Sequence, residues 1–263
     1  MLKIIDFHTH AFPDSLAKRA MEKLQDDDIV AYLDGRLDSL IKSMDEAGIS
    51  KSVLCNIATR PKQFESILSW CKEIASDRII PLPSVHPKDT EWQKKIDLVA
   101  QSGFKGIKLH PYYQEFVLDD NSLIDFYRYI DYKRLFIVMH TGFDIAFPYD
   151  RIADPIKVIN VLNQVPTLKL ITTHLGAWDD WEEVQKHIVG KKIYMEISFS
   201  LEVLDNNIAK DIITKHPDDY ILFGTDSPWT DQKEAISRFM KLPLDKERKE
   251  KILFKNAERI LIL

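Results

Sequence analysis

The feature that most constrains the fold is the regular recurrence of short β-branched runs along the chain. Eight such runs are separated by segments with helical spacing, and they cover residues 4–5, 51–57, 79–85, 106–110, 135–140, 168–174, 193–199 and 220–226. Several runs are apolar throughout, which is typical of strands covered on both faces of a parallel sheet. Strands that alternate with helices predict such a sheet, and eight repeats in 263 residues favour a single-domain (β/α)8 barrel, or TIM barrel, over residues 1–263.

Helix signals fill the gaps between these runs. An apolar stripe over residues 37–47 stops at Gly48, and a second stripe over residues 64–75 follows Pro61. Further helices are expected to begin near Lys88, Asp119, Asp154, Asp179, Leu201 and Asp231, and a last helix is expected over residues 245–263. The segment of residues 12–34 is long for a strand-to-helix connection. Its apolar spacing predicts a helical insertion after the first strand, which we expect to cover the barrel mouth as a lid.

The composition narrows the possible partners of the chain. Its 41 acidic and 36 basic residues give a net charge of -5, so no basic face is expected and nucleic acid is disfavoured as a partner. Only 8 glycines are present, and no glycine-rich phosphate loop is found among them. No signal peptide or membrane span is indicated, so we expect a cytoplasmic protein with no membrane partner and with Cys55 and Cys71 reduced. Barrels of this kind often associate, and by analogy we expect a homodimer.

Residues able to bind a metal or move a proton lie on the first predicted strand or end later ones: His8, His10, His110, His140, His174 and Asp226. Strand periodicity places Asp6, His8 and His10 on one face of the first strand. Because the carboxyl ends of barrel strands meet at one mouth, the six side chains are expected to surround a common point. Imidazole and carboxylate ligands suit Zn²⁺. Asp226 can also accept a proton, or it can cap the next helix, as Thr225 and Ser227 can.

Six motifs occur in order along the chain: DFHTH, GIKLHP, VMHTG, THLGAWDDWEEV, LFGTDSPW and ILFKNAERIL. With them the chain resembles the amidohydrolase superfamily, in the amidohydrolase-related branch that includes aminocarboxymuconate semialdehyde decarboxylase-like enzymes. The resemblance implies one divalent metal, for which Zn²⁺ is the first choice and Mn²⁺ or Fe²⁺ the alternatives. It also implies metal-ligand roles for His8, His10, His140 and Asp226. His174 would bind a second metal or act as a general acid or base.

The fourth predicted strand departs from the two-metal pattern of this superfamily. Binuclear members end that strand with a carboxylated Lys or a Glu, whereas this chain has His110 there and Lys108 two residues earlier. One metal is therefore expected, with His110 as a catalytic or loop-shaping residue. Candidate substrate-binding residues are Lys108, Arg60, Tyr112, Trp178 and Trp229. Arg60 is included because its planar guanidinium suits a carboxylate, and Glu196, which shares a strand face with Ser198, is expected to contact substrate or to pair with a Lys.

Three reactions fit these residues. The first interpretation is hydrolysis of an ester, lactone or amide, in which Asp226 moves the protons of the attacking water and His174 stabilises the oxyanion. The alternative is non-oxidative decarboxylation of a small carboxylic acid, with His174 supplying the proton chemistry. A minor alternative is a phosphoesterase related to TatD-type deoxyribonucleases, which carry a Glu on strand four where this chain has GIKLH. In each case the substrate is expected to be a small molecule.

Overall fold

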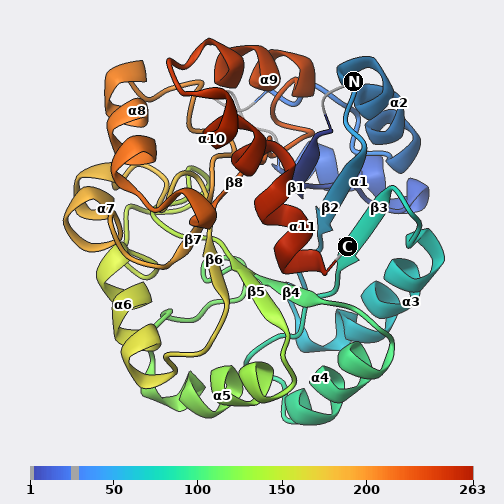
Figure 1. The fold of residues 1–263 in the computed structure, drawn as a ribbon. Coiled ribbons are helices and arrows are strands. Elements are labelled where there is room, and N and C mark those ends of the chain that lie inside the picture. The colour runs from blue at the N-terminus through green and yellow to red at the C-terminus, as the bar shows by residue number, and fades with distance from the viewer. Residues whose placement is uncertain (1–2, 25–29, 263) are drawn as a thin grey trace. The chain divides into compact units, whose positions relative to one another are not determined.

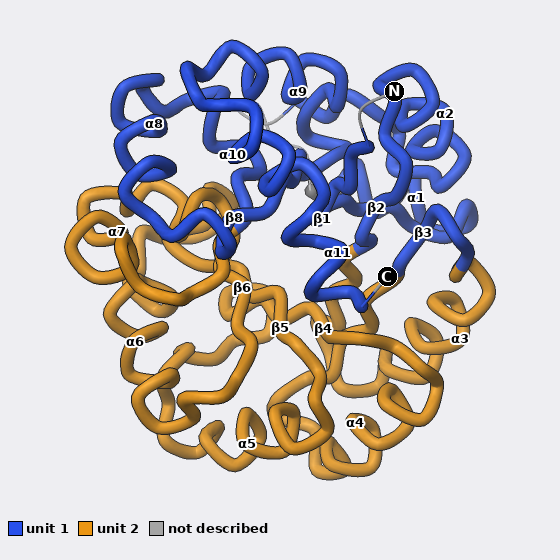
Figure 2. Tube along the Cα trace, viewed as in Figure 1, with its two compact units in different colours: residues 1–54, 76–80, 196–263 blue, residues 55–75, 81–195 orange. Residues whose placement is uncertain are grey.

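The computed structural model describes residues 3–24 and 30–262. The chain divides into two compact units, which Figure 2 shows in different colours. Unit 1 comprises residues 1–54, 76–80 and 196–263, and unit 2 comprises residues 55–75 and 81–195. Strands β3 (Ile79–Leu82) and β7 (Tyr194–Glu196) therefore each have residues in both units.

Unit 1 combines the first two strands with the last strand of the chain (Figure 1). Its elements are β1 (Ile5–Thr9), α1 (Asp14–Leu24), α2 (Leu37–Ala47), β2 (Lys51–Cys55, of which Cys55 is assigned to unit 2), α8 (Asn206–Lys215), η3 (Asp218–Tyr220), β8 (Ile221–Leu222), α9 (Gln232–Lys241), α10 (Lys246–Glu250), η4 (Lys251–Lys255) and α11 (Asn256–Leu261). β1 pairs in parallel with β2 on one edge. On its other edge, the Phe7 N–H donates to the carbonyl of Phe223 at 2.8 Å. β1 is thus an interior strand, and all of its residues are buried.

Unit 2 contains consecutive β/α repeats. Its elements are η1 (Pro61–Gln63), α3 (Phe64–Ile74), α4 (Trp92–Gln101), β4 (Gly106–Leu109), η2 (Asn121–Leu123), α5 (Ile124–Tyr132), β5 (Phe136–Met139), α6 (Pro155–Gln164), β6 (Leu170–Thr172) and α7 (Trp181–His187), with the second half of β3 and most of β7 as flanking segments. The order β4-β5-β6-β7 is parallel throughout. The Lys108 N–H donates to the carbonyl of Pro83 at 2.9 Å, so the end of β3 adjoins β4. This order places the residues that follow β4, β5 and β6 at one edge of the sheet.

Helix boundaries follow the local signals in most places. Gly48 adopts a left-handed φ of 73° and ends α2, and Pro155 begins α6 after the N-cap Asp154. The helix that we expected to begin near Leu201 instead begins at Asn206. The reason is local: the carboxylate of Asp205 accepts the N–H of Asn207 at 2.9 Å and so caps the helix five residues later than expected.

The predicted last helix over residues 245–263 is present as one helical stretch over residues 246–261. It consists of α10, the π-helical turn η4 and α11, which ends at Leu261. In the π-helical turn the carbonyl of Ile252 accepts the N–H of Phe223 at 2.9 Å, in the segment that follows β8. This bond anchors the C-terminal helices to the strands of unit 1.

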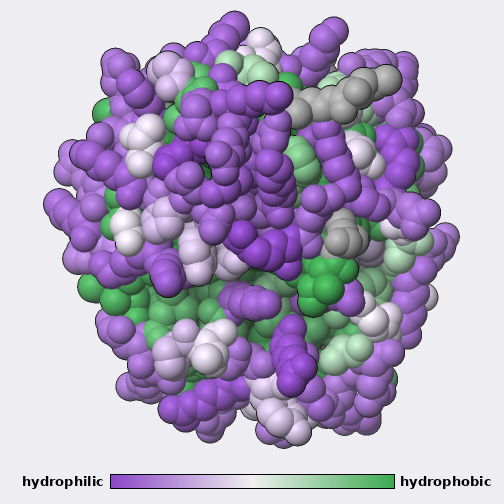
Figure 3. All heavy atoms as spheres, in the orientation of Figure 1, coloured by the Kyte–Doolittle hydropathy of each residue, from purple (hydrophilic) through white to green (hydrophobic). Residues whose placement is uncertain are grey.

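The predicted helical insertion after the first strand is present as α1 (Asp14–Leu24), with Ala17 and Met21 buried. Residues 25–29 of the predicted insertion lie outside the described residues, and its action as a lid stays a prediction. Hydrophilic side chains cover most of the face drawn in Figure 3, in keeping with 29% charged residues. Within residues 3–24 and 30–262, no helix has both the length and the apolar character needed to cross a membrane.

Candidate metal centre and acid-base residues

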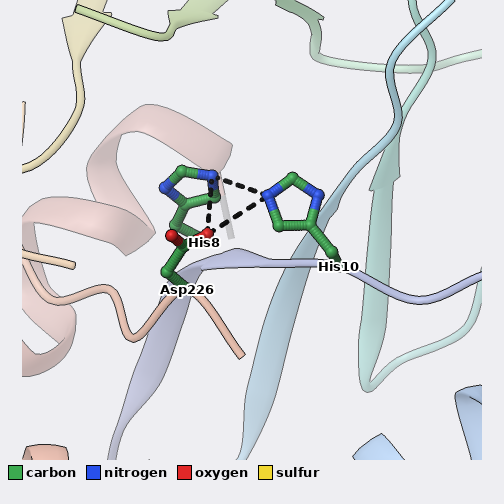
Figure 4. Close-up of side chains that lie close together, drawn as sticks. All are labelled: His8, His10 and Asp226. Atoms are coloured by element: carbon green, nitrogen blue, oxygen red, sulfur yellow. Dashed lines mark hydrogen bonds and ion pairs between the residues drawn. The ribbon is translucent and has the colours of Figure 1, made fainter. Parts of the chain in front are cut away.

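Three side chains from opposite ends of the sequence converge in unit 1 (Figure 4). The Nε2 atoms of His8 and His10 are 3.0 Å apart. Asp226 Oδ1 lies 3.5 Å from His8 Nε2 and 3.2 Å from His10 Nε2. Ligand atoms bound tetrahedrally at about 2.1 Å from Zn²⁺ stand roughly 3.4 Å from one another. The three atoms therefore have the spacing and the chemistry of ligands to one divalent ion.

Glu196 sets the proton position on His8. Its Oε1 lies 2.9 Å from His8 Nδ1, and the carboxylate also accepts the N–H of Ser198 at 2.6 Å and its hydroxyl at 2.8 Å. Because an ionised carboxylate only accepts, His8 Nδ1 carries the proton and Nε2 directs a lone pair toward His10 and Asp226. We expected Glu196 to contact substrate or to pair with a Lys, but the structure places it behind His8, where carboxylates that orient metal-binding imidazoles are found in other proteins.

The glycine of the LFGTD motif accommodates this carboxylate. A Cβ atom on Gly224 would lie 2.3 Å from Glu196 Oε2 and 3.2 Å from the Cβ of His8. Any larger residue at position 224 would therefore displace Glu196 from its place behind the imidazole. The glycine of the motif therefore leaves the space in which Glu196 lies beside His8.

Asp226 does not cap the following helix. Asp231 does so, because its carboxylate accepts the N–H of Lys233 at 2.9 Å. Asp226 has a left-handed φ of 62°, and its N–H donates to the carbonyl of His8 at 2.8 Å. A non-glycine residue in this conformation costs about 1 to 3 kcal/mol, a strain that is often found at functional sites. The turn directs the carboxylate toward the two imidazoles rather than toward α9.

A second group of side chains lies in unit 2, in the segments that follow β4, β5 and β6. The rings of His110 and His140 stack with centres 4.0 Å apart. His174 Nε2 lies 3.3 Å from His140 Nδ1, and Asp144 Oδ2 lies 3.2 Å from His110 Nε2. All three histidines are buried. The structure thus brings three predicted site residues together with Asp144, which sequence reasoning missed although it follows His140 by four positions.

His140 is held in its neutral form. Burial lowers its pKa well below the ordinary value, electrostatic interactions with His110, His174 and Lys108 lower the pKa further, and Asp144 opposes them. His140 Nε2 lies 2.9 Å from the carbonyl of Phe143, so Nε2 carries the proton and Nδ1 presents the lone pair. A neutral imidazole with a directed lone pair is what a metal ligand requires. Its assignment, with His174, to the same ion as His8 stays a prediction.

The backbone around His174 is tightly constrained. His174 and Leu175 both have left-handed φ values, 57° and 55°. The indole N–H of Trp181 donates to the carbonyl of His174 at 3.0 Å and so fixes this turn. Gly142, with φ of 90°, lets the loop after β5 approach the loop after β6, because a Cβ there would lie 2.2 Å from the backbone of Trp178. These contacts hold the loops that carry His140 and His174 in one arrangement.

The predicted substrate-binding residues differ in their surroundings. Lys108 is buried in β4. Arg60 is exposed, and its backbone N–H donates a hydrogen bond to the side-chain oxygen of Gln63. The hydroxyl of Tyr112 donates to the carbonyls of Gly142 and Asp150, at 3.1 and 2.6 Å, and so stabilises the loop that follows β5. Trp178 and Trp229 are half-buried, and the Trp178 ring lies 5.8 Å from that of His174. Their roles toward a substrate stay predictions.

The amidohydrolase family model matches residues 5–263. The chain belongs to the amidohydrolase family. The resemblance drawn from the sequence motifs is therefore confirmed. No curated protein matches this amidohydrolase.

Solved structures similar to this amidohydrolase include a TIM-barrel protein from Bordetella bronchiseptica, at 21% identity and a TM-score of 0.77, covering 99% of each chain. A 5-carboxyvanillate decarboxylase from Sphingomonas paucimobilis has 15% identity, a TM-score of 0.73 and 100% coverage of each chain. A dihydroxybenzoic acid decarboxylase from Polaromonas with bound manganese has 15% identity and a TM-score of 0.75, covering 100% of this chain and 98% of that one. At these identities the likeness shows the fold, and it confirms the predicted TIM barrel.

Replacing Glu196 with glutamine tests its position behind His8. The amide can present an N–H toward His8 Nδ1, which favours the wrong tautomer, so we expect a 10- to 100-fold loss of Zn²⁺ affinity, roughly the usual cost of such a change. Competition with a chromophoric chelator measures the affinity. Glu234→Gln, in an exposed ion pair with Arg238, is the matched control in unit 1. Equal affinities in both variants would contradict the role given to Glu196.

Proposed function

We propose that this amidohydrolase catalyses the metal-dependent, non-oxidative decarboxylation of a small carboxylic acid. The observation that carries the proposal is the pair formed by His110 and Asp144, whose Nε2 and Oδ2 atoms are 3.2 Å apart. Where binuclear members of the superfamily have a bridging ligand, this chain has an imidazole beside a carboxylate. Such a pair can hold a proton and deliver it, which is what the carbon left by CO₂ requires.

The reaction balances with the residues described. The bond between carbon and the carboxylate breaks, CO₂ leaves, and the electron pair stays on the carbon, which takes one proton. His110 is the proposed donor, with Asp144 as its partner, and His174 is the alternative donor. A bound divalent ion would supply positive charge for the substrate's carboxylate or a neighbouring oxygen. His8, His10 and Asp226 would hold that ion, with His140 as the predicted fourth ligand.

The structural neighbours support this choice over the first interpretation from the sequence. Two of the similar structures are decarboxylases, of 5-carboxyvanillate and of a dihydroxybenzoic acid, and the second contains manganese. They favour an aromatic acid as the substrate and make Mn²⁺ a candidate beside Zn²⁺. Hydrolysis of an ester, lactone or amide through Asp226 and His174 is the competing reaction, and the experiment below separates the two.

The test uses the full chain loaded with Zn²⁺ or with Mn²⁺. It is incubated with hydroxybenzoic acids, including 2,6-dihydroxybenzoate and 5-carboxyvanillate, and separately with aryl esters and lactones. We expect metal-dependent release of CO₂ from at least one acid and, in D₂O, one deuterium at the carbon that lost the carboxylate. Metal-dependent hydrolysis of the esters or lactones, with no CO₂ from any acid, would contradict the proposal.

A further inference from the structure

We infer that Asp6 is a positioning residue of the metal centre, because its carboxylate ties the segment that carries His8 and His10 to the segment that carries Asp226. The inference rests on the proposed function only through the three metal ligands, and it does not depend on which reaction follows. Asp6 was expected on the same strand face as the two histidines. Its carboxylate instead lies in a separate, buried hydrogen-bond network.

Four hydrogen bonds converge on the Asp6 carboxylate. Oδ1 accepts the backbone N–H groups of His8 at 3.2 Å and Thr225 at 3.0 Å. Oδ2 accepts the hydroxyl of Thr225 at 2.6 Å and the side-chain amide of Gln232 at 2.8 Å. All of these residues are buried. None of the four donors is charged, so hydrogen bonds alone offset the cost of burying the carboxylate.

Three of the four bonds reach the two segments that carry the proposed metal ligands, two through backbone N–H groups and one through the Thr225 hydroxyl. One holds His8 itself, and two hold Thr225, the residue before Asp226. The Thr225 hydroxyl oxygen, which donates its hydrogen to Asp6, also accepts the N–H of Ser227 at 3.2 Å. This second bond spans the turn that contains Asp226. Removing the carboxylate would break its bonds to His8 and to Thr225 together and leave the backbone bond from Asp226 to His8 as the direct link between the two segments.

Regular strand pairing ends within this region, and only single backbone hydrogen bonds continue it: the Asp226 N–H donates to the carbonyl of His8 at 2.8 Å and the His10 N–H to that of Ser227 at 2.6 Å. β8 ends at Leu222, four residues before Asp226. The pairing of β1 with β2 shifts register between Asp6 and Thr9, within the stretch that carries His8. Past the end of β8, and beside an irregular part of β1, the side-chain hydrogen bonds of Asp6 add to these few backbone bonds. The Asp6 carboxylate therefore helps to fix the separation between the imidazoles and Asp226.

An asparagine cannot reproduce this network. It keeps one acceptor and replaces the other with an NH₂ group, which would face the hydroxyl of Thr225 and the amide of Gln232. We expect Asp6→Asn to lower Zn²⁺ affinity about 10- to 100-fold, the range seen when groups behind metal ligands are changed. Thr225→Val, which removes one of the four bonds, should lower the affinity in the same direction by a smaller factor.

The experiment measures the Zn²⁺ affinity by chelator competition and the unfolding midpoint in urea, on the full chain and its variants. Asn256→Leu is the matched control, because the buried Asn256 amide ties the carbonyls of Asp218 and Ile221 in unit 1, away from the ligands. We expect this control to lose stability and keep its Zn²⁺ affinity, whereas Asp6→Asn and Thr225→Val lose affinity while folded.

Two outcomes would overturn the inference. One is that Asp6→Asn and Thr225→Val lose stability as the control does but bind Zn²⁺ as tightly as the parent chain. The other is that the parent chain binds no divalent ion, which would remove the metal centre itself. If the parent chain binds Zn²⁺ but decarboxylates no acid, the proposed function fails while the affinities of the variants still decide the role of Asp6.

Discussion

His10→Ala is expected to lose its divalent ion and, with it, all metal-dependent activity. His10 supplies one of three converging ligand atoms, at 3.0 Å from His8 Nε2 and 3.2 Å from Asp226 Oδ1. Binding free energies of about 10 to 16 kcal/mol for sites with four ligands amount to roughly 2.5 to 4 kcal/mol per ligand. Loss of one ligand should therefore lower the affinity by about 10²- to 10³-fold, at about 1.4 kcal/mol for each factor of ten.

Metal content after dialysis against a weak chelator, measured by mass spectrometry, checks this prediction. His187→Ala is the matched control, because His187 is half-buried at the end of α7 and pairs with Glu183. The control should retain the metal content of the parent chain. Stoichiometric metal in dialysed His10→Ala would show that the ion is held elsewhere.

His110→Gln is expected to keep its metal and lose most of its decarboxylase activity. His110 is buried, stacks on His140 and lies 3.2 Å from Asp144 Oδ2, so glutamine keeps a polar side chain there but cannot carry a transferable proton. General acid catalysis contributes about 10²- to 10⁴-fold to a rate, so kcat should fall by about that factor. Asp144→Asn should lower kcat less, because His110 remains.

Steady-state rates, measured together with metal content, check this second prediction. His86→Gln is the matched control, a buried histidine of unit 2 whose Nδ1 accepts the N–H of Lys88 at 3.2 Å and so shapes a turn. Its kcat should stay close to that of the parent chain. An unchanged kcat in metal-loaded His110→Gln would assign the proton transfer to another group, with His174 as the first candidate.

Local periodicity is enough to predict most of the fold. Short runs that are apolar throughout mark the strands, and stripes with a period near 3.6 mark the helices, because each pattern records which side chains are buried. End signals are equally local, as Gly48 after α2 and Pro155 at the start of α6 show. The expected start at Leu201 was wrong because a cap at Asp205 decided it. The expected last helix is present over residues 246–261, with a π-helical turn inside it that the sequence pattern does not mark.

The sequence by itself determined the chemical types at the site: two histidines on the first strand, histidines after later strands, and Asp226 in a turn. Only the tertiary structure decided their partners. Glu196 lies behind His8 at a separation of 188 residues, and the Asp6 carboxylate bonds to Thr225 across 219 residues. The physical reason is register, since a slip of one residue turns a strand's side chains to the other face, and no local pattern records it.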